Sequence, residues 1–189
     1  MAKIVLKNVR ASFVNIFEPK GYNGNDPKYS MMLLMPKDHP QYPALVAATV
    51  EAGREEWPAK FKGDSFPKGF KNPVRDGDEE RDTAARPEYE NVYFMNCSSK
   101  QAPKVVDRNP KIALTKDDRR IYSGCYVNVS LNTYAFDVSG NKGVALGLNS
   151  VQFHGDGEAL GGGYSNPEED FDDESDVEDM ELDDDELAG

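Results

Sequence analysis

Apolar and polar residues alternate between residues 121 and 153 in a pattern typical of two neighbouring strands. Successive side chains of a strand point to opposite faces, so one set of residues is predicted to face a core. That set comprises Cys125, Val127, Val129 and Leu131. The opposite face combines small polar residues with the aromatic residues Tyr126, Tyr134 and Phe136. Residues 139–143 have the composition of a tight turn, so the stretch predicts an antiparallel hairpin with one aromatic and polar face.

Three further segments have the composition of strands. Residues 3–17 alternate roughly, with a kink expected near Asn8. Residues 28–35 form a short apolar run that stops at Pro36, and its length favours a buried strand over a helix. Residues 90–98 give the third segment. Together with the hairpin, these segments predict about five strands.

The pattern changes over residues 38–57, where apolar side chains recur every three or four positions. This spacing predicts one helix that begins at Pro43 and ends at Trp57-Pro58. One helix after the second strand, without repeated strand–helix units, predicts an all-β fold: a five-stranded Greek-key barrel of the OB type with long loops. The pattern alone leaves a β-sandwich open.

Two loops separate the helix from the next strand. Residues 60–75 place five basic residues and one acidic residue among Phe61, Phe66 and Phe70. Such a loop can clamp a phosphate chain, or its rings can complete the core, and the second interpretation is favoured for Phe61 and Phe66. Residues 76–90 are acidic and lack apolar periodicity, so an exposed loop is expected.

Charge is distributed unevenly along the chain, whose net charge is −12. Residues 155–189 contain sixteen acidic and no basic residues, which leaves 18 acidic against 22 basic residues in residues 1–154. The body therefore carries +4 and the tail −16. We expect residues 1–160 to form one domain and residues 161–189 to be a disordered acidic tail, because like charges and few apolar residues prevent independent folding.

The net positive charge of the body arises between residues 100 and 120, directly before the aromatic hairpin. Flat rings beside fixed cations are typical of a surface that binds single-stranded nucleic acid, whereas a cover of protein over the rings and a scatter of solvated lysines are the ordinary alternatives. Lys71 and Arg75 are weaker phosphate-binding candidates. The predicted nucleic-acid-binding residues are Lys71, Arg75, Tyr93, Lys100, Lys104, Arg108, Lys111, Arg119, Arg120, Tyr122, Tyr126, Tyr134 and Phe136.

Few features indicate other classes of protein. Cys97 and Cys125 stand alone in predicted strands and are expected to be buried free thiols, while His39 and His154 lack metal-ligand spacing. No catalytic motif accompanies the carboxylates, so neither a catalytic residue, a metal nor a cofactor is predicted. No apolar run approaches membrane-helix length and the first residues do not resemble a signal peptide, so an intracellular protein is expected.

Four ordered blocks carry a family resemblance: residues 72–78 (NPVRDGD), 96–103 (NCSSKQAP), 122–126 (YSGCY) and 143–152 (GVALGLNSVQ). Together they resemble the family formerly catalogued as domain of unknown function 2815, over about residues 3–160. That family includes OB-fold single-stranded DNA-binding proteins of tailed bacteriophages and prophages. More distantly, the layout resembles the single-stranded DNA-binding protein of phage T7, whose acidic tail contacts replication enzymes. The tail of the T7 protein and of its bacterial counterparts ends in an aromatic residue, whereas the present chain ends in Leu187-Ala188-Gly189, so docking through a terminal aromatic residue is not expected here.

The resemblance implies a non-catalytic protein that coats single-stranded DNA during phage replication or recombination in the cytoplasm of the host cell. Its tail is expected to compete with DNA or to recruit replication or recombination proteins through residues 164–189. The alternative is an acidic interaction module without DNA contact of its own, although a cationic body does not favour it. The sequence leaves open whether the chain is a monomer or a homodimer.

Overall fold

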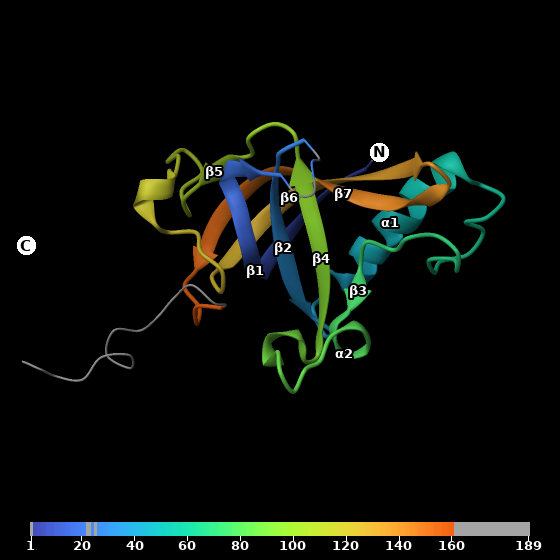
Figure 1. The fold of residues 1–189 in the computed structure, drawn as a ribbon, viewed down its shortest axis with the longest axis horizontal. Helices are drawn as coiled ribbons and strands as arrows, with labels where there is room; N and C mark the ends of the chain where they lie inside the picture. The colour runs from blue at the N-terminus through green and yellow to red at the C-terminus, as the bar shows by residue number, and fades with distance from the viewer. Residues whose placement is uncertain (1, 22–23, 25, 161–189) are drawn as a thin grey trace, which may run out of the picture.

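The computed structural model describes residues 2–21, 24 and 26–160, and the predicted tail, residues 161–189, lies outside them. Seven strands form a single sheet in the order β3-β4-β2-β1-β6-β7-β5 (Figure 1). The strands are β1 (Ala2–Lys20), β2 (Lys28–Pro36), β3 (Arg75–Asp76), β4 (Val92–Ser99), β5 (Lys104–Val106), β6 (Tyr126–Val138) and β7 (Asn141–Gly155). The helices are α1 (Tyr42–Glu56) and the four-residue α2 (Gly77–Glu80), with 3-10 turns η1 (Pro87–Tyr89) and η2 (Lys116–Asp118).

The five long strands close into a barrel, as predicted. β1 pairs antiparallel with β2 and β6, β2 pairs with β4, and β6 pairs with β7. Closure comes from a short parallel contact between β4 and β7, in which Cys97 lies opposite Leu146. The predicted OB-type barrel is therefore confirmed, and β3 and β5 extend its sheet at the two edges.

β1 has three register shifts along its length and serves two sides of the barrel. Its first half pairs with β6 and its second half with β2. The register shifts between Leu6 and Val9, where Asn8 has a φ of 55°, so the predicted kink is confirmed. A second shift lies between Ser12 and Asn15. Such bulges increase the local twist of a strand and re-aim its side chains.

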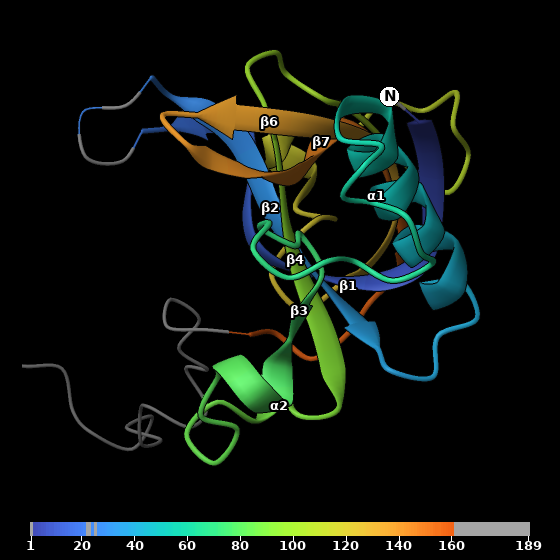
Figure 2. The ribbon, with the colours of Figure 1, turned by 90° about the vertical axis from the view of Figure 1, so that its right-hand side faces the viewer.

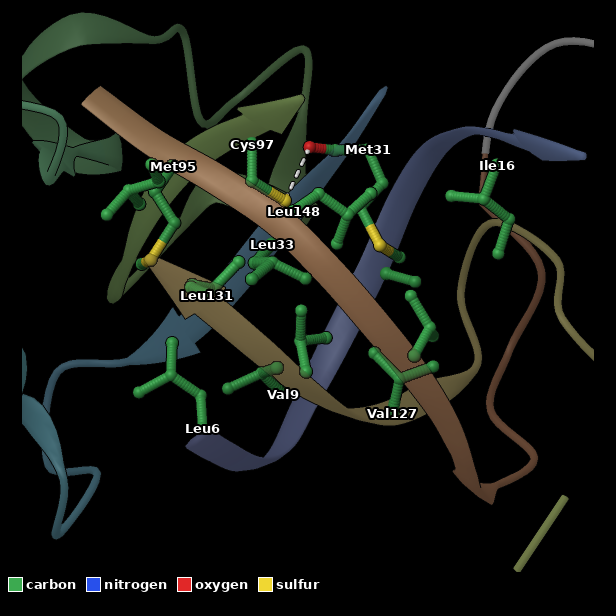
Figure 3. Packing of buried hydrophobic residues seen from close by; sticks show 14 of the residues in the cluster. Leu6, Val9, Ile16, Met31, Leu33, Met95, Cys97, Val127, Leu131 and Leu148 are labelled. Atoms are coloured by element: carbon green, nitrogen blue, oxygen red, sulfur yellow. Dashed lines mark hydrogen bonds between the residues drawn. The ribbon is translucent and has the colours of Figure 1, made fainter. Parts of the chain in front are cut away.

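The barrel interior is filled by apolar side chains from all five long strands (Figure 3). Cys125, Val127, Val129 and Leu131 are fully buried, which confirms the predicted core face of the hairpin. Both cysteines are buried free thiols, and the Cys97 sulfur donates a hydrogen bond to the Met31 carbonyl oxygen at 3.4 Å.

A second apolar cluster covers part of the outside of β2 and β4. It consists of Met32, Leu34, Tyr89 and Phe94, with Val92 and Leu160 packed against it. β2 is thus buried on both faces, which explains its uninterrupted apolar run. The expectation that residues 76–90 form an exposed loop is wrong at Tyr89, which is only 2% exposed. The reason is tertiary: η1 places the ring of Tyr89 edge-on to Phe94, with centroids 5.3 Å apart, and a single ring leaves no periodic pattern to detect.

Helix α1 packs against β1, β6 and β7, and Figure 2 shows it beside β1. It begins at Tyr42 with Pro43 in the first turn and ends before Trp57, close to the predicted limits. Phe61 is 1% exposed and occupies the space that a side chain at Gly53 would fill, so the core interpretation of Phe61 is confirmed.

Candidate nucleic-acid interface

A groove of about 780 Å³ runs across the barrel between the β1–β2 connection and the β6–β7 hairpin. Figure 2 shows the end of β1, the start of β2 and the tip of this hairpin projecting to the same side of the barrel. Its walls come from the second half of β1, from β2, from the end of β4 and from the start of β7. We refer to it as the β2–β4 groove.

A row of three lysines crosses one end of this groove. Lys20 of β1 pairs with Lys28 of β2. Tyr29 of β2 pairs with Ser99 of β4, so Lys28 and Lys100 occupy neighbouring positions just beyond that pair. All three side chains line the groove, where Asp26 is the only acidic residue among the described lining residues. The three lysines concentrate positive charge at this end of the groove.

The floor of the groove combines short polar side chains with apolar ones such as Met32 and Leu146. Ser30 pairs with Ser98, and Met32 pairs with Asn96, on the adjacent strands β2 and β4. Asn15 of β1 adds a third short polar side chain. A floor of this kind offers hydrogen bonds without a dense array of charges, which suits a chain of sugars and bases held above it.

An aromatic ring stands at the wall of the groove. Phe13 of β1 is 51% exposed and has a φ of 46°, in the left-handed region. Sequence reasoning missed it because Val9 and Ala11 face the core, and strict alternation would place Phe13 inside with them. It also missed Lys20 and Lys28, although lysines at both ends of the turn-rich stretch 18–27 were a usable signal once an OB barrel was expected.

One of the predicted residues lines this groove, and a second lies beside it. Lys100 belongs to the lysine row. Tyr134 of β6 pairs with the groove residue Ala145 of β7, and its side chain is 36% exposed. The β6–β7 hairpin therefore contributes one ring near the groove, on the side opposite the β1–β2 connection.

The predicted cations of the 104–120 segment lie near the far end of β7. β5 begins at Lys104 and pairs with Ser150–Gln152, about 20 Å along the strand from Ala145 at roughly 3.3 Å per residue. Arg108 and Arg120 hold their guanidinium carbons 5.3 and 4.2 Å from the centroid of the Phe153 ring. Arg120 also pairs with Asp107 at 3.1 Å. These two arginines are therefore held by contacts within the fold.

The backbone N–H of Arg108 and, secondarily, the side chain of Arg120 hydrogen-bond the Asp107 carboxylate and lower its pKa. The side chains of Lys104, Lys111 and Arg119 are exposed, and none of them pairs with an acidic side chain among the described residues. Besides Lys100, these three cations of the 100–120 segment remain available for an external anion.

Tyr122 and Tyr126 lie beneath the segment that follows β7. The Tyr122 hydroxyl accepts the N–H of Gly157 at 3.1 Å, and burial is the main cause of its raised pKa. Arg10 lies 5.9 Å from the ring centroid of Tyr126 and donates to the Glu158 carbonyl oxygen at 2.6 Å. Both tyrosines are half-buried, so they offer less ring surface than Phe13.

Tyr93 and Arg75 border a separate hollow of about 790 Å³. The ring of Tyr93 stacks on Tyr42, with centroids 4.3 Å apart and an angle of 5° between the planes. A hydrogen bond between the two hydroxyls is the main reason why the pKa of Tyr42 rises to about 12. Arg75 pairs with Glu80 at 2.9 Å and lies 4.8 Å from the ring centroid of Phe94.

Lys71 and Phe136 meet at the tip of the hairpin. Phe136 pairs with Gly143, and Gly143 forms a parallel bridge with Lys71. A side chain at Gly143 would collide with the backbone of Lys71, which explains the glycine. The predicted residues consequently lie in several regions: the groove, the far end of β7, the surface under residues 156–160, and the Tyr93 hollow with the hairpin tip.

The strand order and the position of the groove define the class of protein. β2 and β4 correspond to the second and third strands of an OB barrel, and the groove lies between the connection of its first two strands and the hairpin of its last two. This is the face on which OB folds bind oligonucleotides and oligosaccharides.

The chain belongs to the family described as the single-stranded DNA-binding protein of Enterobacter phage Enc34, whose model matches residues 2–182. Protein p50 of Acyrthosiphon pisum secondary endosymbiont phage 1 is 37% identical over 186 residues, covering 95% of this chain and 98% of p50. The family resemblance noted from the sequence is therefore confirmed.

Solved structures agree with this assignment. The single-stranded DNA-binding protein of bacteriophage Enc34 in complex with single-stranded DNA matches with a TM-score of 0.67 and 26% identity, covering 84% of this chain and 89% of that chain. The gp2.5 protein of bacteriophage T7, also a single-stranded DNA-binding protein, matches with a TM-score of 0.57 over 92% of this chain and 98% of that chain. At 14% identity, the T7 protein supports the fold alone. No helix within the described residues is long and apolar enough to cross a membrane.

Proposed function

We propose that this protein binds single-stranded DNA through the β2–β4 groove without reading base sequence. The observation that carries the proposal is the lysine row, in which Lys20 of β1, Lys28 of β2 and Lys100, directly after β4, line one end of the groove at the binding face of an OB barrel. This concentration of positive charge attracts a polyanion, and each phosphate contact makes binding more sensitive to salt.

Exposed rings complete the chemistry that such a site requires. Phe13 and Tyr134 present exposed faces at or beside the groove, and a base stacked on a ring contributes about 1–3 kcal/mol whatever its identity. The short polar residues of the floor have no arrangement specific to one base edge. Binding is therefore expected to be sequence-independent and to weaken steeply with salt.

The names of the relatives support a role in a phage. The Enc34 protein is named for single-stranded DNA binding, and p50 belongs to a phage. We place this protein in phage DNA replication or recombination, in the cytoplasm of the host cell, as a binding protein without catalytic activity or cofactor.

The acidic residues 161–189 have a second role in this proposal, as a competitor of DNA and as a contact for replication or recombination proteins. Support comes from Leu160, the last described residue, which packs against the apolar cluster on the outside of β2 and β4. Leu160 therefore lies on the outer face of β2 and β4, which also carries the groove. A polyanion tethered to this face would have a high effective concentration near the cationic groove.

Titration of a fluorescently labelled oligothymidine tests the proposal. We expect binding by the full chain at low salt, loss of affinity as salt rises, and similar affinity for oligonucleotides of different sequence. The decisive sample is the chain truncated after Gly163, which retains every described strand. If this form does not bind single-stranded DNA at low salt, the proposed function is wrong.

A further inference from the structure

Phe13 has a backbone conformation that a phenylalanine seldom adopts. Its φ of 46° lies in the left-handed region, which disfavours a bulky side chain. The residue lies where the register of β1 against β2 shifts between Ser12 and Asn15. The Asn15 side chain donates a hydrogen bond to the Phe13 carbonyl oxygen at 3.2 Å and so holds the bulge in place.

The same strand contains a natural comparison for this bulge. At the register shift between Leu6 and Val9 the left-handed residue is Asn8, and asparagine tolerates this conformation well. If folding were the only requirement, asparagine would suit position 13 better than phenylalanine, as it does at position 8 of the same strand. Strained residues of this kind tend to persist where function requires them.

The bulge also determines the direction of the ring. Val9 and Ala11 are fully buried, so a regular strand would turn Phe13 into the barrel. The side chain is instead 51% exposed, and the next fully inward residue of β1 is Ile16. Phe13 belongs to neither of the two apolar clusters formed by the described residues. The strained backbone thus removes a ring from the core and presents it to solvent.

The Phe13 ring lies in the groove that is proposed to hold DNA. Phe13 lines the β2–β4 groove together with the lysine row. Its neighbour Asn15 lines both this groove and a smaller hollow of about 340 Å³ that continues along β1. Phosphates held by the lysines would therefore leave their bases within reach of the exposed face of Phe13.

We propose that Phe13 is the principal base-stacking residue of the groove and that the strain at this bulge is retained to present its ring. The inference rests on the proposed binding of single-stranded DNA. Beyond that function, it identifies Phe13 as the residue that stacks on the flat face of an unpaired base and the bulge as the cause of its exposure.

Three substitutions separate the ring from the backbone: Phe13→Asn, which copies the solution at Asn8; Phe13→Leu, which keeps an apolar side chain without a ring; and Phe13→Trp, which keeps a ring. With a short oligothymidine of about five nucleotides, Phe13→Asn and Phe13→Leu should bind about 5- to 150-fold more weakly, the equivalent of one lost stacking contact. Phe13→Trp should retain binding. Because Phe13 is uncharged, none of the three should change the slope of log K against log salt.

The Phe13→Trp variant also allows stacking of a base at position 13 to be measured by tryptophan fluorescence. The natural chain has one tryptophan, Trp57, whose ring packs near Phe61 at 6.0 Å, away from the groove lining. Oligothymidine should quench the new indole at position 13 and leave the emission of Trp57 in the unaltered protein nearly constant. Ile112→Asn is the matched control, since Ile112 is also 51% exposed but does not line the groove.

The possible outcomes are distinct. The inference is overturned if the unaltered protein binds oligothymidine and Phe13→Asn and Phe13→Leu bind it equally well. It is also overturned if both variants lose affinity together with a lower melting temperature, because Phe13 would then act in packing. Failure of the unaltered protein to bind would instead reject the proposed function itself.

Discussion

The lysine row yields a quantitative prediction for the double substitution of Lys28 and Lys100 by alanine. These residues follow the Tyr29–Ser99 pair on neighbouring strands, and neither forms an ion pair with another described residue. Removing two adjacent like charges should leave the melting temperature unchanged or raise it. Affinity for DNA should fall, because each lysine can neutralise one phosphate.

The size of the effect follows from counterion release. Each phosphate contact on a single strand contributes about 0.7 to the slope of log K against log salt, so two lost contacts lower the slope by about 1.4. Between 50 and 200 mM salt, the unaltered protein should therefore lose about 7-fold more affinity than the double variant. The two proteins should approach the same affinity as salt increases.

Fluorescence anisotropy with a labelled oligothymidine at several salt concentrations measures both quantities. The matched control is the double substitution of Lys3 and Lys7, which are exposed on the first half of β1 and do not line the groove. The control removes the same charge and should preserve the slope. Parallel slopes for the Lys28/Lys100 variant and the unaltered protein would refute the assignment of these lysines to phosphate contacts.

Three further predictions concern regions outside the lysine row. Substituting Lys111 and Arg119 by alanine should weaken binding of an oligothymidine of about sixteen nucleotides but not of one of about five, because the residues lie beyond the groove; equal effects on both lengths would contradict this. Truncation after Gly163 should tighten binding at low salt, and unchanged affinity would reject competition by the tail but not partner recruitment. Burial raises the pKa of Cys97 to about 12 and also raises the pKa of Cys125. Neither thiol should therefore react with a thiol reagent at pH 8 until denaturant is added. The free energy of unfolding should also decrease above about pH 8.5, because the thiols ionise there in the unfolded chain but stay protonated in the folded protein. Rapid labelling of the folded protein would show that this burial is transient.

Local patterns predicted the elements of this fold well, for a physical reason. The two faces of β6, the kink at Asn8 and the start of α1 at Pro43 each depend on side-chain periodicity or on the conformational preference of one residue. The error at Tyr89 has the complementary cause. A single ring in an acidic loop becomes buried only because β2 and β4 present an apolar patch to it.

The candidate site depended far more on tertiary structure. The segment from residue 100 to residue 120 carries the net charge of the body, yet Arg108 and Arg120 lie against Phe153 and only Lys100 reaches the groove. The lysine row combines residues from three strands that are separated along the chain by a turn and by the whole of α1. No spacing rule along one segment could have grouped them.

By itself, the sequence determined that this chain forms a small β-barrel with one main helix, a cationic body and an acidic end, because composition and periodicity act locally. Only the tertiary structure decided which charges and rings share a surface. Strand pairing places Lys20, Lys28 and Lys100 side by side, and one bulge reverses the direction of Phe13. Both features arise from register, which depends on how distant strands meet and not on any one of them alone.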